Sequence, residues 1–129
     1  MKKKYIPERS LFKSFSYALR GIGFSFFSQR NMQIHSLAAC STIGLGWYFK
    51  LQLIEWTLIV ISIFGVLISE MINTSIELSV DLTTRKRKIR AMLAKDVAAG
   101  TVLLAALNAV IIGSLIFFPR FVTLCQGGS

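Results

Sequence analysis

The spacing of apolar residues changes along the chain, and the change predicts two kinds of helix. Over residues 10–30 the apolar positions recur with a helical period, and Lys13, Ser16, Tyr17 and Arg20 fall between them. Such a pattern predicts an amphipathic helix that lies in the plane of a membrane interface, with Ser10 as a candidate N-cap. The periodic apolar residues are Leu11, Phe12, Phe15, Ala18, Leu19, Ile22 and Phe26.

Three continuous apolar blocks follow, and each predicts a membrane-spanning helix. They cover residues 34–49, 51–72 and 97–118; the second continues as helix to 82 and the third stops at Pro119. The first block is short for a span of about 20 residues, so it draws on flanking residues. The chain has 129 residues, 53% of them hydrophobic, and a mean hydropathy of +0.60. These values predict one all-α membrane domain over residues 1–129, a surface helix plus three transmembrane helices.

Basic residues outnumber acidic ones and fall on one side of the predicted membrane. The chain has 15 Lys and Arg against 6 Asp and Glu, a formal net charge of +9. Seven basic residues precede the first block and six lie between the second and third, whereas Lys50 and Arg120 fall on the other side. The positive-inside rule therefore predicts a cytoplasmic N-terminus and a C-terminus outside. We expect no nucleic-acid partner, because most apolar residues would have no water-excluded place without lipid.

Acidic residues gather where the second apolar block ends. The polar positions there are Glu70, Asn73, Glu77 and Asp81. Their separations of 3, 4 and 4 residues place them on a helical stripe about 80° wide and roughly 16 Å long. Asp96, which follows Lys95 at the start of the third block, falls at the same membrane face in the predicted topology. Four of the six acids therefore meet in one interfacial region.

Carboxylates at membrane depth are costly unless they are paired, bound to metal or functional, so three explanations stand. The acids could pair with Arg and Lys to fix helix packing, or form a proton or ion pathway. They could also form a catalytic site in which acids bind a divalent metal and one acts as a base. A mixed set of acids, an amide and a lysine favours metal and phosphate chemistry. The sequence has no GxxxxGK[ST] or GxGxxG loop, so a nucleotide site would rely on side chains and metal.

Two segments carry a family resemblance. "SEMINTSIELSVDL" followed by "AKDVAAGTVLLAA" resembles the small prokaryotic integral-membrane lipid kinases, the diacylglycerol kinase and undecaprenol kinase family. The likeness extends over roughly residues 10 to 119 and includes "SFSYALRGI". The positions that match the family pattern in type and spacing are Glu70, Asn73, Thr74, Ile76, Glu77, Asp81, Lys95 and Asp96.

The resemblance implies ATP-dependent phosphorylation of a lipid hydroxyl at the cytoplasmic face of a bacterial inner membrane, by a homotrimer with shared active sites that uses Mg²⁺. It implies that Glu70 is the general base and Glu77 a metal ligand, and that Tyr17 lies near the adenine. The residues implied to line the nucleotide and phosphate region are Asn73, Asp81, Lys95 and Asp96.

One position departs from the family pattern. Gln29 stands where relatives usually carry a glutamate that holds metal together with the counterpart of Glu77. A neutral amide oxygen is a weaker ligand for Mg²⁺, so we expect weaker metal binding there.

His35 is expected to be an interfacial residue, because no cluster of ligands surrounds it. "AKDVAAGTVLLAA" resembles the undecaprenol kinase branch of the family more closely, which implies undecaprenol as the first candidate acceptor and diacylglycerol as the second. Outside the class, the alternatives are an ion-conducting oligomer and a non-catalytic scaffold.

Overall fold

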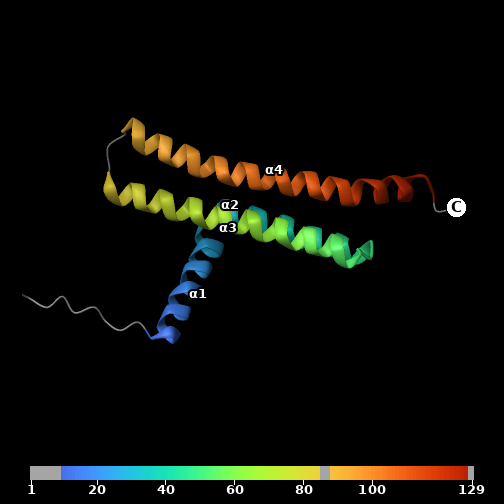
Figure 1. The fold of residues 1–129 in the computed structure, drawn as a ribbon, viewed down its shortest axis with the longest axis horizontal. Coiled ribbons are helices and arrows are strands. Elements are labelled where there is room, and N and C mark those ends of the chain that lie inside the picture. The colour runs from blue at the N-terminus through green and yellow to red at the C-terminus, as the bar shows by residue number, and fades with distance from the viewer. Residues whose placement is uncertain (1–9, 85–87, 128–129) are drawn as a thin grey trace, which may run out of the picture.

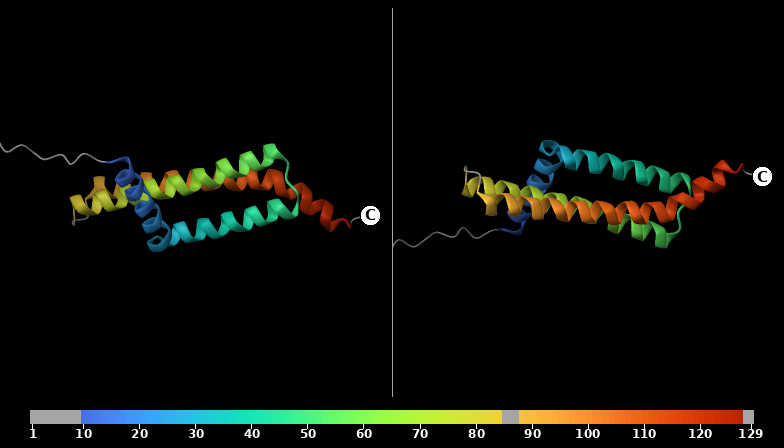
Figure 2. Two further views of the ribbon diagram at one scale, coloured as in Figure 1. Left: turned by 90° about the horizontal axis from the view of Figure 1, so that it is seen from below. Right: turned by 90° about the horizontal axis from the view of Figure 1, so that it is seen from above.

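The computed structural model describes residues 10–84 and 88–127. Within those ranges every regular element is a helix: α1 (Leu11–Ser28), α2 (Arg30–Tyr48), α3 (Leu53–Thr83) and α4 (Ile89–Cys125). Figure 1 shows α3 and α4 running antiparallel along their length, and Figure 2 shows α2 packed beside them. α1 crosses the bundle near the end where α3 finishes, at a steep angle to the other helices. The predicted all-α class is confirmed.

The breaks between the helices follow from backbone conformation. Gln29 is extended, with φ −104° and ψ 116°, so it separates α1 from α2. Ser10 occupies the N-cap position of α1, although its side chain makes no capping hydrogen bond within the described residues. Lys50 has φ 52°, a left-handed conformation that turns the chain from α2 toward α3. Gln52 and Glu55 then form a reciprocal capping box that starts α3.

α4 continues through Pro119 to Cys125, whereas the sequence pattern places a stop at that proline. Proline lacks an N–H and cannot donate to the preceding turn, which bends a helix without necessarily ending it. Arg120 Nη1 donates to the carbonyl oxygen of Ile116 at 2.6 Å and so binds the backbone next to the proline. Figure 2 shows the axis of α4 bending toward its C-terminal end.

α3 and α4, with 31 and 37 residues, are each long and apolar enough to cross a membrane. Most of their large apolar side chains are exposed, and the examples are Leu58, Ile61, Phe64, Leu104 and Val110. A small buried cluster lies at the end of the bundle far from α1 and comprises Leu51, Ile59, Ile116 and Phe117. A bundle with so little interior and so much exposed apolar surface is typical of a chain surrounded by lipid or by further copies.

Candidate active site

A cavity of about 370 Å³ lies among α2, α3 and α4, beside the first turns of α2. We call it the acidic cavity. Glu70, Asn73 and Glu77 of α3 contribute its polar wall, because their spacing puts them on one face of the helix. The remaining lining residues are Asn31, Ile34 and His35 of α2 and Ala99, Val102, Leu103 and Ala106 of α4. Three of the four residues of the predicted stripe therefore line one open cavity.

Glu70 is the most unusual residue of this cavity. Its side chain is 2% exposed, and Oε2 is buried without a hydrogen-bond partner among the described residues. Thr74 Oγ1 donates to the backbone oxygen of Glu70 at 2.9 Å, which leaves the carboxylate unaffected. An unpaired buried acceptor costs roughly 1–3 kcal/mol, and more when it is charged. Among residues 10–84 and 88–127, nothing supplies the donor or cation that would compensate for the burial of the Glu70 oxygen.

Asn73 and Glu77 form a second polar group in the same wall. Asn73 Nδ2 donates to Glu77 Oε1 at 3.1 Å. Asn73 Oδ1 is buried and, like Glu70 Oε2, has no hydrogen-bond partner in the described part of the chain. An amide oxygen can accept a hydrogen bond or ligate a hard cation. The wall thus presents two unpaired oxygen atoms and one carboxylate that is already oriented.

Asp81 and Lys95 lie outside the acidic cavity and bond to each other. Lys95 Nζ is 2.6 Å from Asp81 Oδ1, and the two side chains are 37% and 63% exposed. Exposed ion pairs contribute about 0–1 kcal/mol, so this one mainly aligns α3 with α4. Asp81 thus has a structural partner in Lys95, whereas Glu70 Oε2 has none among the described residues. Asp96 is exposed next to Lys95.

Tyr17 and Gln29 also lie outside the set that lines the acidic cavity. Tyr17 is 53% exposed on α1, and the guanidinium carbon of Arg20 lies 5.9 Å from its ring centroid. Gln29 is half-buried at the junction between α1 and α2. A role for Tyr17 near adenine and for Gln29 near metal stays a prediction.

Asn31 and His35 are cavity residues that the sequence pattern did not single out for the site. The prediction treats His35 as an interfacial residue, but its side chain forms part of the cavity wall. The one signal available was their spacing of four residues, which puts both on the same face of α2. That spacing does not identify them as site residues, because the sequence does not show which face of α2 meets α3.

The side chains of the cavity fit a partial rather than a complete metal site. Within residues 10–84 and 88–127, no group of three or more His, Cys, Asp or Glu side chains could hold a metal ion. Mg²⁺ is commonly bound by one or two carboxylates together with substrate phosphates and water. Glu77 and the amide oxygen of Asn73 match such a set, in which the nucleotide would supply the remaining ligands.

Comparison with known proteins identifies the class. The prokaryotic diacylglycerol kinase family matches residues 16–117. The chain is 45% identical over 109 residues to the undecaprenol kinase of Bacillus subtilis (strain 168), covering 84% of this chain and 89% of the relative. It is 37% identical over 116 residues to a diacylglycerol kinase of Synechocystis sp., covering 89% of this chain and 66% of the relative. A diacylglycerol kinase of Helicobacter pylori is 29% identical over 96 residues, covering 74% of this chain and 75% of the relative.

A helical membrane bundle with these relatives is a membrane-bound lipid kinase. The chain belongs to the prokaryotic diacylglycerol kinase family, as its sequence motifs predicted.

Proposed function

We propose that this kinase transfers the γ-phosphoryl group of ATP to the hydroxyl of a membrane lipid, with undecaprenol as the first candidate acceptor and diacylglycerol as the second. The observation that carries the proposal is the buried Oε2 of Glu70 in the acidic cavity, which has no hydrogen-bond partner in the described part of the chain. The relative named undecaprenol kinase, at 45% identity, favours the first acceptor over the second. A relative named diacylglycerol kinase is 37% identical.

Glu70 is the proposed general base. Its unpaired oxygen accepts a hydrogen bond from the lipid hydroxyl, which also relieves the cost of the buried acceptor. As the hydroxyl oxygen bonds to the γ-phosphorus and the bond to ADP breaks, the hydroxyl proton passes to the Glu70 carboxylate. A position away from water favours this transfer, because solvent does not compete for the hydroxyl.

The nucleotide would occupy the polar side of the cavity and the surface beyond it. Mg²⁺ would neutralise phosphate charge, and Glu77 with Asn73 would hold it, since they supply a carboxylate and an amide oxygen. Gln29 would be a weak further ligand. In this proposal Tyr17 contacts the adenine, and the residues along the phosphates are Asp81, Lys95 and Asp96.

A homotrimer with shared sites would bring the outlying residues to the cavity. Lys95 and Asp96 lie outside the acidic cavity of their own chain, and Lys95 is held by Asp81. A neighbouring copy could present its own basic group at the cavity mouth. The extensive exposed apolar surface of α3 and α4 leaves ample area for such an assembly.

The chain is proposed to cross the cytoplasmic membrane of a bacterium three times. α2 has 19 residues and would reach about 28 Å, close to the ~30 Å of hydrocarbon. α1 crosses the bundle toward the end where α3 finishes, and its exposed Leu11, Phe12 and Phe15 suit a helix lying in the interface. The distribution of basic residues puts the N-terminus and the cavity at the cytoplasmic face, where ATP is available.

The proposal is tested with purified protein in lipid vesicles supplied with ATP, Mg²⁺ and either undecaprenol or diacylglycerol. Wild type should phosphorylate an acceptor, and undecaprenol should give the higher kcat/KM. Glu70→Gln should lower turnover about 10²–10⁴-fold, the usual cost of losing a general base, while the helix content stays unchanged.

Ser69→Ala is the matched control beside Glu70. The Ser69 hydroxyl donates to the carbonyl oxygen of Gly65 at 2.8 Å and lies outside the acidic cavity, so activity should stay close to wild type. Full activity in Glu70→Gln would rule out Glu70 as the base. Absence of lipid phosphorylation by wild type with both acceptors would refute these acceptors.

A further inference from the structure

Asn108 is a polar side chain in the middle of the apolar helix α4. It lies between Lys95 and Arg120, the two residues of α4 that form ion pairs with α3. Along the helix axis it is about 18–20 Å from each of them. The Asn108 side chain is exposed, and its amide makes no hydrogen bond with residues 10–84 or 88–127. In the proposed membrane topology this amide lies near the centre of the hydrocarbon.

An amide without a hydrogen bond is costly in hydrocarbon, where no water is available to bind it. Hydroxyl side chains in these helices avoid the cost by bonding to their own backbone. Ser62 Oγ donates to the carbonyl oxygen of Leu58 at 2.8 Å, and Thr101 Oγ1 donates to that of Ala98 at 2.6 Å. The Asn108 amide has two N–H donors and one acceptor oxygen, and within the described residues all of them lack such a bond.

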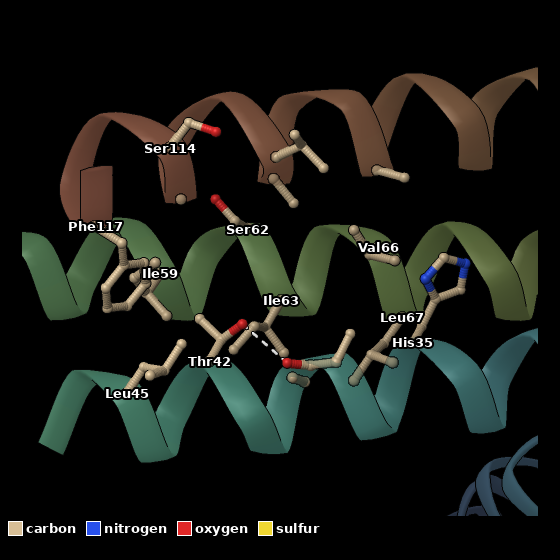
Figure 3. A pocket seen from close by; sticks show the side chains of 16 residues that line it. His35, Thr42, Leu45, Ile59, Ser62, Ile63, Val66, Leu67, Ser114 and Phe117 are labelled. Carbon is tan, nitrogen blue, oxygen red and sulfur yellow. Dashed lines mark hydrogen bonds between the residues drawn. The ribbon is translucent and has the colours of Figure 1, made fainter. Parts of the chain in front are cut away.

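Asn108 lies on the side of α4 away from α2. Ala98 and Ile116 of α4 are buried and mark the side that faces α3. At about 100° per residue, Asn108 lies roughly 80° round the helix from both, whereas Ala106 lies roughly 80° in the opposite direction. Ala106 lines two cavities that α2 also borders, and Asn108 lines neither. Figure 3 shows the α2 side, where side chains of α2, α3 and α4 surround one of these cavities.

The side of the α3–α4 pair that carries Asn108 is open. Figure 2 shows α2 along one side of this pair and no described helix along the other side at mid-length. A cavity of about 440 Å³ lies between the two helices where α3 ends, and its walls include Ile76 of α3 and Ala94 of α4. By the helical period, Ile72 and Gly65 lie within about 40° of Ile76, and Asn108 lies within about 40° of Ala94. A Cβ at Gly65 would meet no atom within 4 Å.

We call this side of the pair the open face. Its exposed members are Gly65 and Ile72 of α3 and Thr101, Leu104, Asn108 and Leu115 of α4.

We propose that a helix from a second copy of this chain packs against the open face and hydrogen-bonds to Asn108; this inference rests on the proposed function. α2 would then cover one side of the α3–α4 pair and the second copy would cover the other. Helices in membranes associate through small residues that allow close approach and through polar side chains that bond across the contact. The open face has both, in Gly65 and Asn108.

Depth favours a second copy over a lipid or an unrelated protein. A lipid chain has no donor or acceptor, so it would leave the amide unpaired. Copies inserted in the same direction carry equivalent residues at equal depth. The ion pairs at the two ends of α3 and α4 set a register in which Gly65 lies within about one helical turn of Asn108. A second copy therefore brings an amide and an uncovered backbone to the level of Asn108, which an unrelated protein would have to match independently.

An association experiment tests the role of the amide. Asn108→Leu removes it and keeps a side chain of similar size. The matched control exchanges two neighbours, Leu107→Asn with Asn108→Leu, which keeps the composition and moves the amide about 100° round the helix. Leu107 is 50% exposed and faces directly away from the buried side of α4.

The dissociation constant is measured by energy transfer between copies labelled at Cys125, in vesicles without ATP, while added lipid dilutes the protein. Asn108→Leu should raise the dissociation constant by about 3- to 30-fold for each hydrogen bond lost, and the exchanged variant should show the same loss. An unchanged constant in Asn108→Leu, or association as tight as wild type in the exchanged variant, would overturn the proposal.

A photo-crosslinking experiment identifies what covers the open face. Benzoylphenylalanine replaces Thr101 on the open face or, as the control, Leu107, and the protein is irradiated in vesicles. Position 101 should give a covalent product of twice the chain's mass, whereas position 107 should give lipid adducts. Lipid adducts alone from position 101, or equal yields of the double-mass product from both positions, would contradict a second copy on this face. Neither experiment requires phosphoryl transfer, so their outcome is independent of whether the kinase assignment and its acceptors hold.

Discussion

Glu70 and Asp81 lie on the same stripe of α3, yet their surroundings differ. Asp81 is 63% exposed and bonded to Lys95, so its charge is compensated by both water and a partner. Glu70 is 2% exposed with an unpaired oxygen, so its charge has neither of these within the described residues. A buried carboxylate without a partner is a candidate binding or catalytic group, because a bound ligand can supply the hydrogen bond or the cation that the protein does not.

The metal role of Gln29 can be tested by restoring a carboxylate. If Gln29 lies near the metal held by Glu77, Gln29→Glu adds a charged oxygen ligand and should shift the Mg²⁺ dependence of activity to lower concentration. The measurement is initial rate against Mg²⁺ concentration for wild type and Gln29→Glu. Superimposed curves would show that Gln29 is remote from the metal, in keeping with its place outside the cavity lining. Gln33→Glu, on the exposed surface of α2, controls for added charge.

The sequence predicted the polar face of α3 well, because a helix of known period fixes which of its own residues share a face. It did not predict the pairing of Lys95 with Asp81, which depends on the register between α3 and α4. It also missed His35 as a wall residue, because the face of α2 that meets α3 is decided by packing between helices.

At the scale of elements, the hairpin between α2 and α3 depends on close approach at Gly46. A Cβ at Gly46 would lie 2.7 Å from Trp56 Cη2 and 3.1 Å from Leu51 Cδ1. The Trp56 ring has little freedom to move, because it packs at 5.6 Å from the Trp47 ring and against the buried cluster. The absence of a side chain therefore sets how closely α2 and α3 approach at this end.

Gly46→Ala should destabilise the protein by roughly 1–3 kcal/mol through this overpacking. Gly44→Ala, two residues earlier in the same helix, meets open space and should be neutral or slightly stabilising. Thermal unfolding of both variants in the same detergent measures the difference. Equal melting temperatures for the two variants would mean that Trp56 moves aside without cost.

The far ends of α3 and α4 are joined by a second polar contact. Arg120 Nη2 lies 2.8 Å from both carboxylate oxygens of Glu55, and these side chains are 26% and 20% exposed. The same arginine binds the backbone carbonyl of Ile116 beside the bend at Pro119. One side chain thus connects the start of α3 to the bent part of α4, which explains why the helix persists beyond the proline.

Arg120→Ala should therefore lower the free energy of unfolding by roughly 1.5–3 kcal/mol, the scale for hydrogen bonds to a charged group. The free energy of unfolding is followed by thermal unfolding in detergent. At temperatures where the variant stays folded, its phosphorylation rate should remain close to wild type, because the Glu55–Arg120 pair lies at the opposite end of α3 from Glu70. An unchanged melting temperature for Arg120→Ala would show that the pair is replaced by water.

At the scale of the whole molecule, the polar cavity and the buried apolar cluster lie toward opposite ends of one bundle. The acidic cavity, the crossing of α1 and the Asp81–Lys95 pair lie at one end. The buried cluster around Phe117 and the Glu55–Arg120 pair lie at the other. A segment of α3 between these ends, residues 56–69, has no ionisable side chain. A lipid kinase needs this polarity, because ATP comes from water and the acceptor comes from the bilayer.

The orientation that the distribution of basic residues predicts can be measured with the native cysteines. Cys125, exposed at the end of α4, should lie outside the membrane, whereas Cys40 of α2 should lie at hydrocarbon depth if α2 spans the membrane as proposed. A charged, membrane-impermeant maleimide added to spheroplasts should label Cys125, because a thiol reacts as a thiolate and needs water. Cys125→Ser should abolish the labelling.

In the Cys125→Ser background, Thr83→Cys at the exposed end of α3 should react only after permeabilisation. Labelling of Cys125 only after permeabilisation would reverse the orientation and move the acidic cavity away from cytoplasmic ATP.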